Sequence, residues 1–254
     1  MSATFSPGTF RPAPKRASAG AIILAQGGME AKLMLRHGEQ QLLSIIIPLA
    51  ILIGTARLES STGHGLHEVF PMVLAVAATS AGFTGQAISL AFDRRYGALK
   101  RTGASGVPAW AIIGGKIIGV LTMVVFQILV LGATAFALGL RISAPGILLM
   151  IVSLIFGVAA FTAMGLVLGG TLSSEAVLAL ANLIWFILLA IVGWTLYSQG
   201  LGDNGLLNIV PTVALAGALA DASNSTFPGI ELISLTAWLA VASYAAVRWF
   251  RFDG

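Results

Sequence analysis

Residues 92–101 read Phe92-Asp93-Arg94-Arg95-Tyr96-Gly97-Ala98-Leu99-Lys100-Arg101 and separate two of the longest apolar runs in the chain. Half of these residues are charged, and each charge would cost about 2.5–3.5 kcal/mol at the centre of a bilayer. This segment, which we call the charged island, therefore lies in water or against a partner. The apolar runs beside it are suited to lipid.

The composition supports a membrane protein throughout. Of 254 residues, 57% are hydrophobic and only 9% are charged, whereas soluble domains carry about 25% charged residues. The chain contains no cysteine, which excludes disulfides, thiolate metal sites and cysteine nucleophiles. The net charge of +4 does not indicate nucleic-acid binding, because basic residues normally flank membrane spans.

We predict an all-α polytopic fold with six transmembrane helices, because backbone groups in lipid must be satisfied within a helix. The predicted spans are Leu42–Leu58, Val69–Phe92, Trp110–Leu140, Ile147–Thr171, Ala176–Leu196 and Ile230–Phe250. Each is close to or above the length needed to cross about 30 Å of hydrocarbon. Residues 1–19 are expected to form a disordered basic arm, and residues 20–254 a single transmembrane domain.

The basic residues predict the orientation of these spans. With six spans and an inside N-terminus, every Lys and Arg except Arg57 and Arg141 lies inside, as the positive-inside rule requires. An additional span at Leu206–Ala220 would move Arg248 and Arg251 outside, so we interpret that segment, which contains Pro211, as external. It forms either a shallow re-entrant hairpin buried against neighbouring helices or an apolar surface loop.

A helix is also expected before the first span, over about residues 20–40. Ile22, Ala25, Met29 and Leu33 fall on one face, and Gln26, Glu30 and His37 on another. This amphipathic pattern is typical of a helix in the membrane interface. The alternative is a cytoplasmic extension of the first span.

Several patterns suggest catalytic or ligand-binding chemistry and fail on inspection. Gly103-Ala104-Ser105-Gly106 resembles the serine motif of rhomboid-type intramembrane proteases. In that family the histidine base lies on a later span, whereas His37, His64 and His67 all precede Ser105. His64 and His67 are also too weak a pattern for a metal site, so we expect no catalytic residue and no metal or cofactor on this chain.

Gly114-Gly115-Lys116 invites comparison with a phosphate-binding P-loop, but Trp110 stands where the first glycine belongs and Ile117 replaces the hydroxyl residue. Lys116 is instead expected to snorkel from the inner end of the third span. Glu175 follows Ser173-Ser174, a pattern that predicts a helix N-cap with a carboxylate in the first turn.

The order of these parts resembles the permease subunit of a type-2 ABC exporter of the daunorubicin-resistance kind. That family has an acidic-Arg-acidic-x-Gly-Thr-Leu segment after the second span and a Gly-Lys in the third. The corresponding residues here are Asp93-Arg94-Arg95-Tyr96-Gly97-Ala98-Leu99 and Gly115-Lys116. Arg95 replaces the second acidic residue and Ala98 the threonine. A proline-bearing segment before the last span is matched by Leu207-Asn208-Ile209-Val210-Pro211.

The resemblance implies a function and partners. Two permease chains, alike or similar, would work with two cytoplasmic ATP-binding cassette subunits, which hold ATP and Mg²⁺. The complex would export a drug-like or lipid-like substrate across a bacterial cytoplasmic membrane, with both termini of this chain inside. The charged island would dock on the ATPase, with Arg94 and Arg95 available for ion pairs, Tyr96 and Leu99 for apolar anchoring, and Gly97 for the turn.

For the substrate path, the resemblance points to the first, second and fifth spans near the seam between permease chains. We assign Phe83, Gln86, Asn182 and Trp185 to that surface. The rival function is a self-contained carrier or channel without an ATPase partner. Proton-driven carriers usually hold charged residues within their spans, and apart from Lys116 near an edge, none of the predicted spans has a charged residue in its interior.

Overall fold

A computed structural model describes residues 17–36, 38–63, 65–104 and 106–249. The all-α prediction is confirmed, because the regular elements of these ranges are all helical. In chain order they are α1 (Ala19–Arg36), α2 (Gly38–Thr62), α3 (Leu66–Thr79), the π-helix η1 (Ser80–Gly85), α4 (Gln86–Arg95), α5 (Ala98–Ala104), α6 (Ala109–Ala137), α7 (Ala144–Thr171), α8 (Ser174–Gln199), the 3-10 helix η2 (Gly205–Ile209), α9 (Pro211–Ser223) and α10 (Gly229–Trp249). The expected arm over residues 1–19 lies almost wholly outside the described residues.

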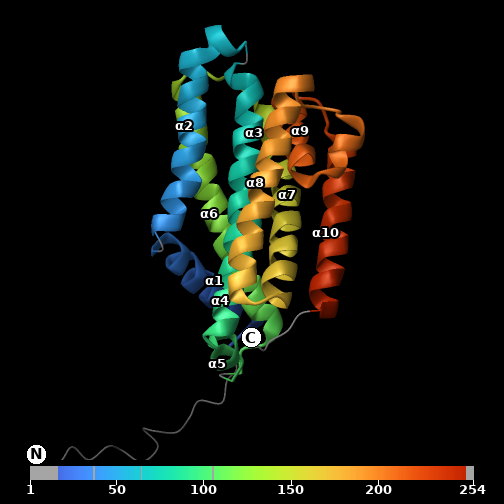
Figure 1. Ribbon diagram of the computed structural model, residues 1–254. Coiled ribbons are helices and arrows are strands. Elements are labelled where there is room, and N and C mark those ends of the chain that lie inside the picture. The colour runs from blue at the N-terminus through green and yellow to red at the C-terminus, as the bar shows by residue number, and fades with distance from the viewer. Residues whose placement is uncertain (1–16, 37, 64, 105, 250–254) are drawn as a thin grey trace, which may run out of the picture.

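Five helical stretches are long and apolar enough to cross a membrane. They are Leu66–Arg95, Gly114–Ala137, Ala144–Thr171, Ser174–Gln199 and Gly229–Trp249. The remaining predicted span, Leu42–Leu58, falls within α2, which runs alongside the other long helices (Figure 1). Its described apolar part, Ile45–Arg57, is shorter than the roughly 20 residues that a span needs, so the count of six spans stays a prediction.

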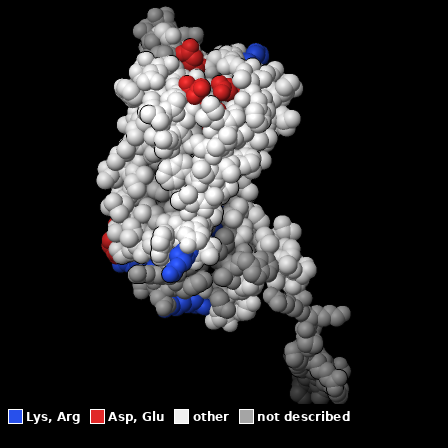
Figure 2. Space-filling view, turned by 90° about the vertical axis from the view of Figure 1, so that its right-hand side faces the viewer, with Lys and Arg blue, Asp and Glu red and all other residues white. Residues whose placement is uncertain are grey.

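Charged side chains gather at the two ends of the bundle. Figure 2 shows Lys and Arg mainly at the end near α5, Asp and Glu mainly at the opposite end, and a broad uncharged band between them on this face. We call these the basic end and the acidic end. This distribution is what a membrane-spanning bundle requires, because charges are expensive in hydrocarbon.

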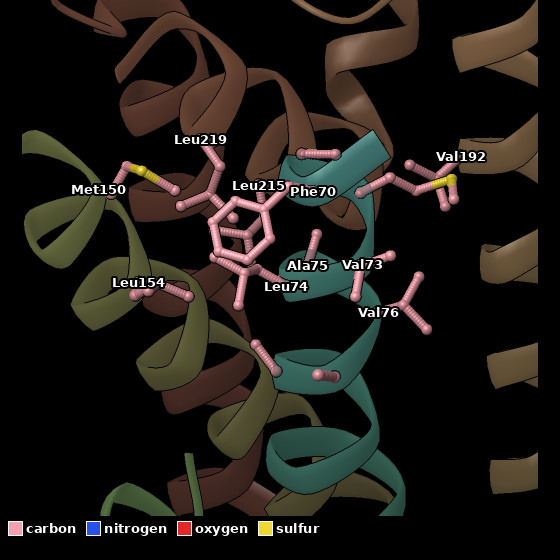
Figure 3. Packing of buried hydrophobic residues seen from close by; sticks show 14 of the residues in the cluster. Phe70, Val73, Leu74, Ala75, Val76, Met150, Leu154, Val192, Leu215 and Leu219 are labelled. Carbon is pink, nitrogen blue, oxygen red and sulfur yellow. The ribbon is translucent and has the colours of Figure 1, made fainter. Parts of the chain in front are cut away.

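The core is centred on α3, which the other helices surround. Phe70, Val73 and Leu74 of α3 are almost completely buried and face Met150 and Leu154 of α7, Val192 of α8 and Leu215 and Leu219 of α9 (Figure 3). Because α3 is buried on most sides, its sequence is a nearly continuous apolar run and not an amphipathic pattern.

The segment around Pro211 divides into an exposed part and a buried part. Leu206 and Ile209 of η2 are exposed, whereas nearly every residue of α9 is buried, against α3, α7 and α10. Pro211 begins α9, where its missing N–H removes no hydrogen bond. The surface-loop alternative is therefore wrong for α9, and its packing agrees with the re-entrant alternative (Figure 1).

Helix α1 docks on α6 through small residues. A Cβ on Gly27 would lie 2.6 Å from Ile118, and a Cβ on Gly115 would lie 2.7 Å from Gln26, so the two glycines allow the helices to approach closely. Elsewhere on α1, Leu24, Met29 and Leu33 are exposed. Apolar exposure suits a helix in the membrane interface, but its placement there stays a prediction.

Candidate functional site

The charged island is a helix, a turn and a second helix. The helix that begins at Leu66 continues past the predicted end at Phe92, through η1 and α4, to Arg95. Gly97 then adopts φ +67°, a left-handed conformation that glycine takes without steric cost, and α5 follows. Phe92 and Tyr96 stack with ring centroids 6.0 Å apart. The turn expected at Gly97 is therefore present.

Asp93 belongs to a partly buried charge cluster that joins three helices. The Nζ atom of Lys116 on α6 lies 2.5 Å from Oδ2 of Asp93 and 3.2 Å from Oε1 of Glu30 on α1. Only 2% of the Lys116 side chain is exposed, so the prediction that it snorkels to the interface is wrong. An ammonium group can be buried here because two carboxylates compensate its charge.

Arg94 holds the end of α7. Its Nη1 donates hydrogen bonds to the carbonyl oxygens of Gly169, at 2.8 Å, and Leu172, at 3.0 Å. Only 6% of Arg94 is exposed. A helix C-terminus has unpaired carbonyl groups and a partial negative charge. The guanidinium group of Arg94 donates hydrogen bonds to the carbonyls, and its positive charge compensates the partial negative charge.

Arg95 holds the start of α8. Its Nη1 donates to Oγ of Ser174 at 3.0 Å and forms an ion pair with Glu175. Ser173 caps this helix, because its Oγ accepts a hydrogen bond from the backbone N–H of Ala176 at 3.4 Å. The predicted N-cap with Glu175 in the first turn is thus confirmed, and the structure adds Arg95 as a partner of that carboxylate.

Three consecutive residues therefore connect α4 to four other helices. Asp93 reaches α6 and, through Lys116, α1, while Arg94 reaches α7 and Arg95 reaches α8. We call these three residues and their partners the α4 junction. The apolar side of α5 adds a further link, because Leu99 packs with Leu90, Leu166 and Ala246, the last of them on α10. A displacement of α5 would therefore be transmitted to most helices of the bundle.

The surface left open at this end differs from the sequence-based expectation. Tyr96 is 65% exposed, and Lys100 and Arg101 are exposed as well. Arg94 and Leu99 are buried, and Arg95 bonds to α8 while half of its side chain stays exposed, so their role in docking stays a prediction. The partners of Arg94 and Arg95 on α7 and α8 could not be predicted, because no feature of the local sequence distinguishes an Arg that binds another protein from one that caps a distant helix.

The four residues assigned to a substrate path do not share one open surface. Phe83 and Gln86 are buried inside the chain, and the two amide atoms of Gln86 have no hydrogen-bond partner among the described residues. Asn182 lies exposed on α8, where its Nδ2 donates to the carbonyl of Leu178 at 2.7 Å. Trp185 packs against the same core as Phe83, and its ring meets Phe186 edge to face.

The acidic end carries its own buried carboxylate. Glu231 of α10 is 2% exposed and accepts a hydrogen bond from Nδ2 of Asn208 at 3.0 Å. Burial and the charge of Asp203 raise the pKa of Asp221 in α9. Within the described ranges no three His, Asp or Glu side chains are grouped so that they could hold a metal ion.

These features fit the family to which the chain belongs. Residues 27–200 match the family model of the ABC-2 type transporter membrane domain, a range that runs from the second half of α1 to the end of α8. The chain therefore belongs to the ABC-2 type transporter family, whose members are transport permeases rather than enzymes and generally work with an ATP-binding subunit. No curated protein and no solved structure matches the sequence.

Proposed function

We propose that this chain is the permease of an ATP-driven exporter, and that α4, the Gly97 turn and α5 receive the motion of a cytoplasmic ATP-binding cassette subunit. The observation that supports this proposal is the α4 junction. A docking element must both present an open surface and be fixed to the helices that move. Tyr96 and Lys100 provide the open surface. Asp93, Arg94 and Arg95 fix the element to the other helices.

The orientation follows from charge. The basic end is cytoplasmic, since Lys and Arg are retained on that side, and α1, α5 and the end of α10 lie there (Figure 1). We place the protein in a bacterial cytoplasmic membrane with both termini inside, paired with a second permease chain and two ATP-binding subunits. ATP and Mg²⁺ bind to those subunits and not to this chain.

The substrate is proposed to be amphipathic or hydrophobic, of a drug-like or lipid-like class. Asn182 and Trp185 on α8 contact it first. Phe83 and Gln86 reach it only when α8 separates from η1 and α4, because both side chains are buried inside the chain and α8 contacts both of those elements. Gln86 suits such a role, since its buried amide gains hydrogen-bond partners when the helices part.

Substitution of the open surface tests the docking role. We expect Tyr96→Ala combined with Lys100→Glu to reduce recovery of the ATP-binding subunit that co-purifies with the wild-type chain by at least about tenfold, since an exposed aromatic anchor is a typical hot spot. The unfolding temperature should change little, because these side chains lie outside the α4 junction. Quantitative co-purification and stimulated ATP hydrolysis measure the effect.

Tyr244→Ala is the matched control, because Tyr244 is another exposed aromatic residue, on α10. It should leave binding of the ATP-binding subunit unchanged. Undiminished binding and stimulated hydrolysis in the Tyr96, Lys100 double variant would show that docking occurs elsewhere.

A further inference from the structure

An apolar groove lies between α6, α7 and α10. Its volume is about 580 Å³, within the range of small-molecule binding sites. Its walls include Ile117 and Leu121 of α6, Val158 and Ala159 of α7, and Ser243 and Val247 of α10. Among all the residues assigned to its lining, only Thr162 and Ser243 are polar and none is charged.

The groove spans the depth of one membrane leaflet. On α7 its lining extends from Ile155 to Leu166, a rise of about 16 Å at 1.5 Å per residue. The hydrocarbon core of a bilayer is about 30 Å thick, so this length matches one half of it. The lining residues of α6 and α10 lie in the halves of those helices nearer the basic end.

Basic residues follow the groove where it ends. Leu166 and Ala246 belong both to its lining and to the cluster that holds Leu99 of α5, and Lys100 and Arg101 come directly after Leu99. Arg248 follows the lining residue Val247 and is exposed. The carboxylates of Asp93, Glu30 and Glu175 at this end are already paired with Lys116 and Arg95.

We propose that this groove binds one acyl chain of an anionic phospholipid from the leaflet at the basic end. The acyl chain fills the apolar groove, and the phosphate of the headgroup contacts Arg248 of α10 and Arg101 of α5. Anionic headgroups are attracted to basic side chains at the membrane surface, and burial of methylene groups supplies the remaining affinity. Because the lipid touches Leu166 and Ala246, it also steadies α5.

Lipid titration of the purified full-length chain tests this proposal. Delipidated protein is mixed with phosphatidylglycerol or phosphatidylcholine of identical acyl chains, and native mass spectrometry counts the lipid retained. We expect one tightly held phosphatidylglycerol, preferred over phosphatidylcholine about fivefold or more. Ala159→Phe, which fills the groove, should weaken binding at least tenfold. Ser243→Leu, at an exposed position on the rim, should weaken it as well and serves if Ala159→Phe does not fold.

Matched variants separate the groove from the general membrane surface. Ala240→Phe adds the same ring to an exposed position of α10 outside the groove and should leave retention unchanged. Arg248→Gln should abolish most of the headgroup preference, whereas Arg141→Gln at the acidic end should not. Equal retention by all variants would mean that only annular lipid is bound, and a dimeric particle that retains no lipid would assign the groove to a second copy. Either result would overturn the proposal.

Discussion

The double variant Glu30→Gln, Asp93→Asn is expected to lose about 3–5 kcal/mol of unfolding free energy, because it leaves the ammonium of Lys116 buried with no counter-charge. In the native chain that group has Asp93 at 2.5 Å and Glu30 at 3.2 Å and is 2% exposed. Each single variant leaves one carboxylate in place. We therefore expect each to cost clearly less than half of the double variant, a non-additivity typical of a shared partner.

A triple variant distinguishes charge compensation from simple packing loss. Adding Lys116→Met to the double variant removes the uncompensated charge and should recover most of the stability, since buried ion clusters replaced by groups of similar volume are often neutral in stability. Chemical or thermal unfolding in detergent measures the wild type, the two single variants, the double variant and the triple variant. Stability losses that simply add, or a triple variant that is the least stable, would contradict the assigned role of Lys116.

Gly165→Ala is expected to destabilise the chain by about 2–3 kcal/mol and to reduce folded yield. A Cβ at this position would lie 2.7 Å from the carbonyl oxygen of Phe83 and 2.9 Å from that of Gly82. Both atoms belong to the backbone of η1, so no side chain can turn aside, and overpacking of this kind costs 1–3 kcal/mol or more. The clash would force the π-helix and α7 apart.

Gly193→Ala is the matched control for this substitution. It also lies within a long helix, α8, but a Cβ there would meet nothing within 4 Å. Both substitutions gain the same helix propensity, about 1 kcal/mol, so the difference in unfolding free energy isolates the contact with η1. Equal stabilities of the two variants would show that Gly165 does not control this crossing.

The helices were largely predictable because the dominant physical term, the cost of polar groups in hydrocarbon, acts on local stretches of sequence. Composition and apolar runs alone placed Ala144–Thr171 and Ser174–Gln199 within a few residues. The end of α4 was missed. Its helix continues past Phe92 into charged residues, because Asp93, Arg94 and Arg95 each find a partner on another helix.

The fold determines which residues of different helices contact each other, and these pairings leave little signal in the local sequence. Gly165 and Gly169 have the four-residue spacing that is typical of close helix packing, but this spacing does not reveal that their partners are the π-helical turn and α4. Lys116 looked like an edge residue because the carboxylates that compensate it lie 23 and 86 positions earlier in the chain. For the same reason Phe83 and Gln86 could not be recognised as buried within a single chain.

The α4 junction gives the coupling proposal a physical route. A force on the exposed surface of α5 is transmitted to α4 through the Gly97 turn. Helix α4 is in turn bonded to the ends of α7 and α8 and to the charge cluster of α1 and α6. The π-helix η1 lies within the same long helix, and such turns are common at functional positions of helices. Movement at the basic end would thus reach the core that covers Phe83 and Gln86.

Site-specific cross-linking tests the central claim that α5 docks on an ATP-binding subunit. The chain has no cysteine, so single-cysteine variants need no background removal. Ala104→Cys places a thiol on the exposed end of α5, and Leu206→Cys places one on the exposed η2 at the acidic end. With a short thiol cross-linker in membranes that contain both subunits, we predict a cross-link to the ATP-binding subunit from Ala104→Cys and none from Leu206→Cys. A cross-link from Leu206→Cys alone, or from neither variant while the complex is intact, would contradict this account.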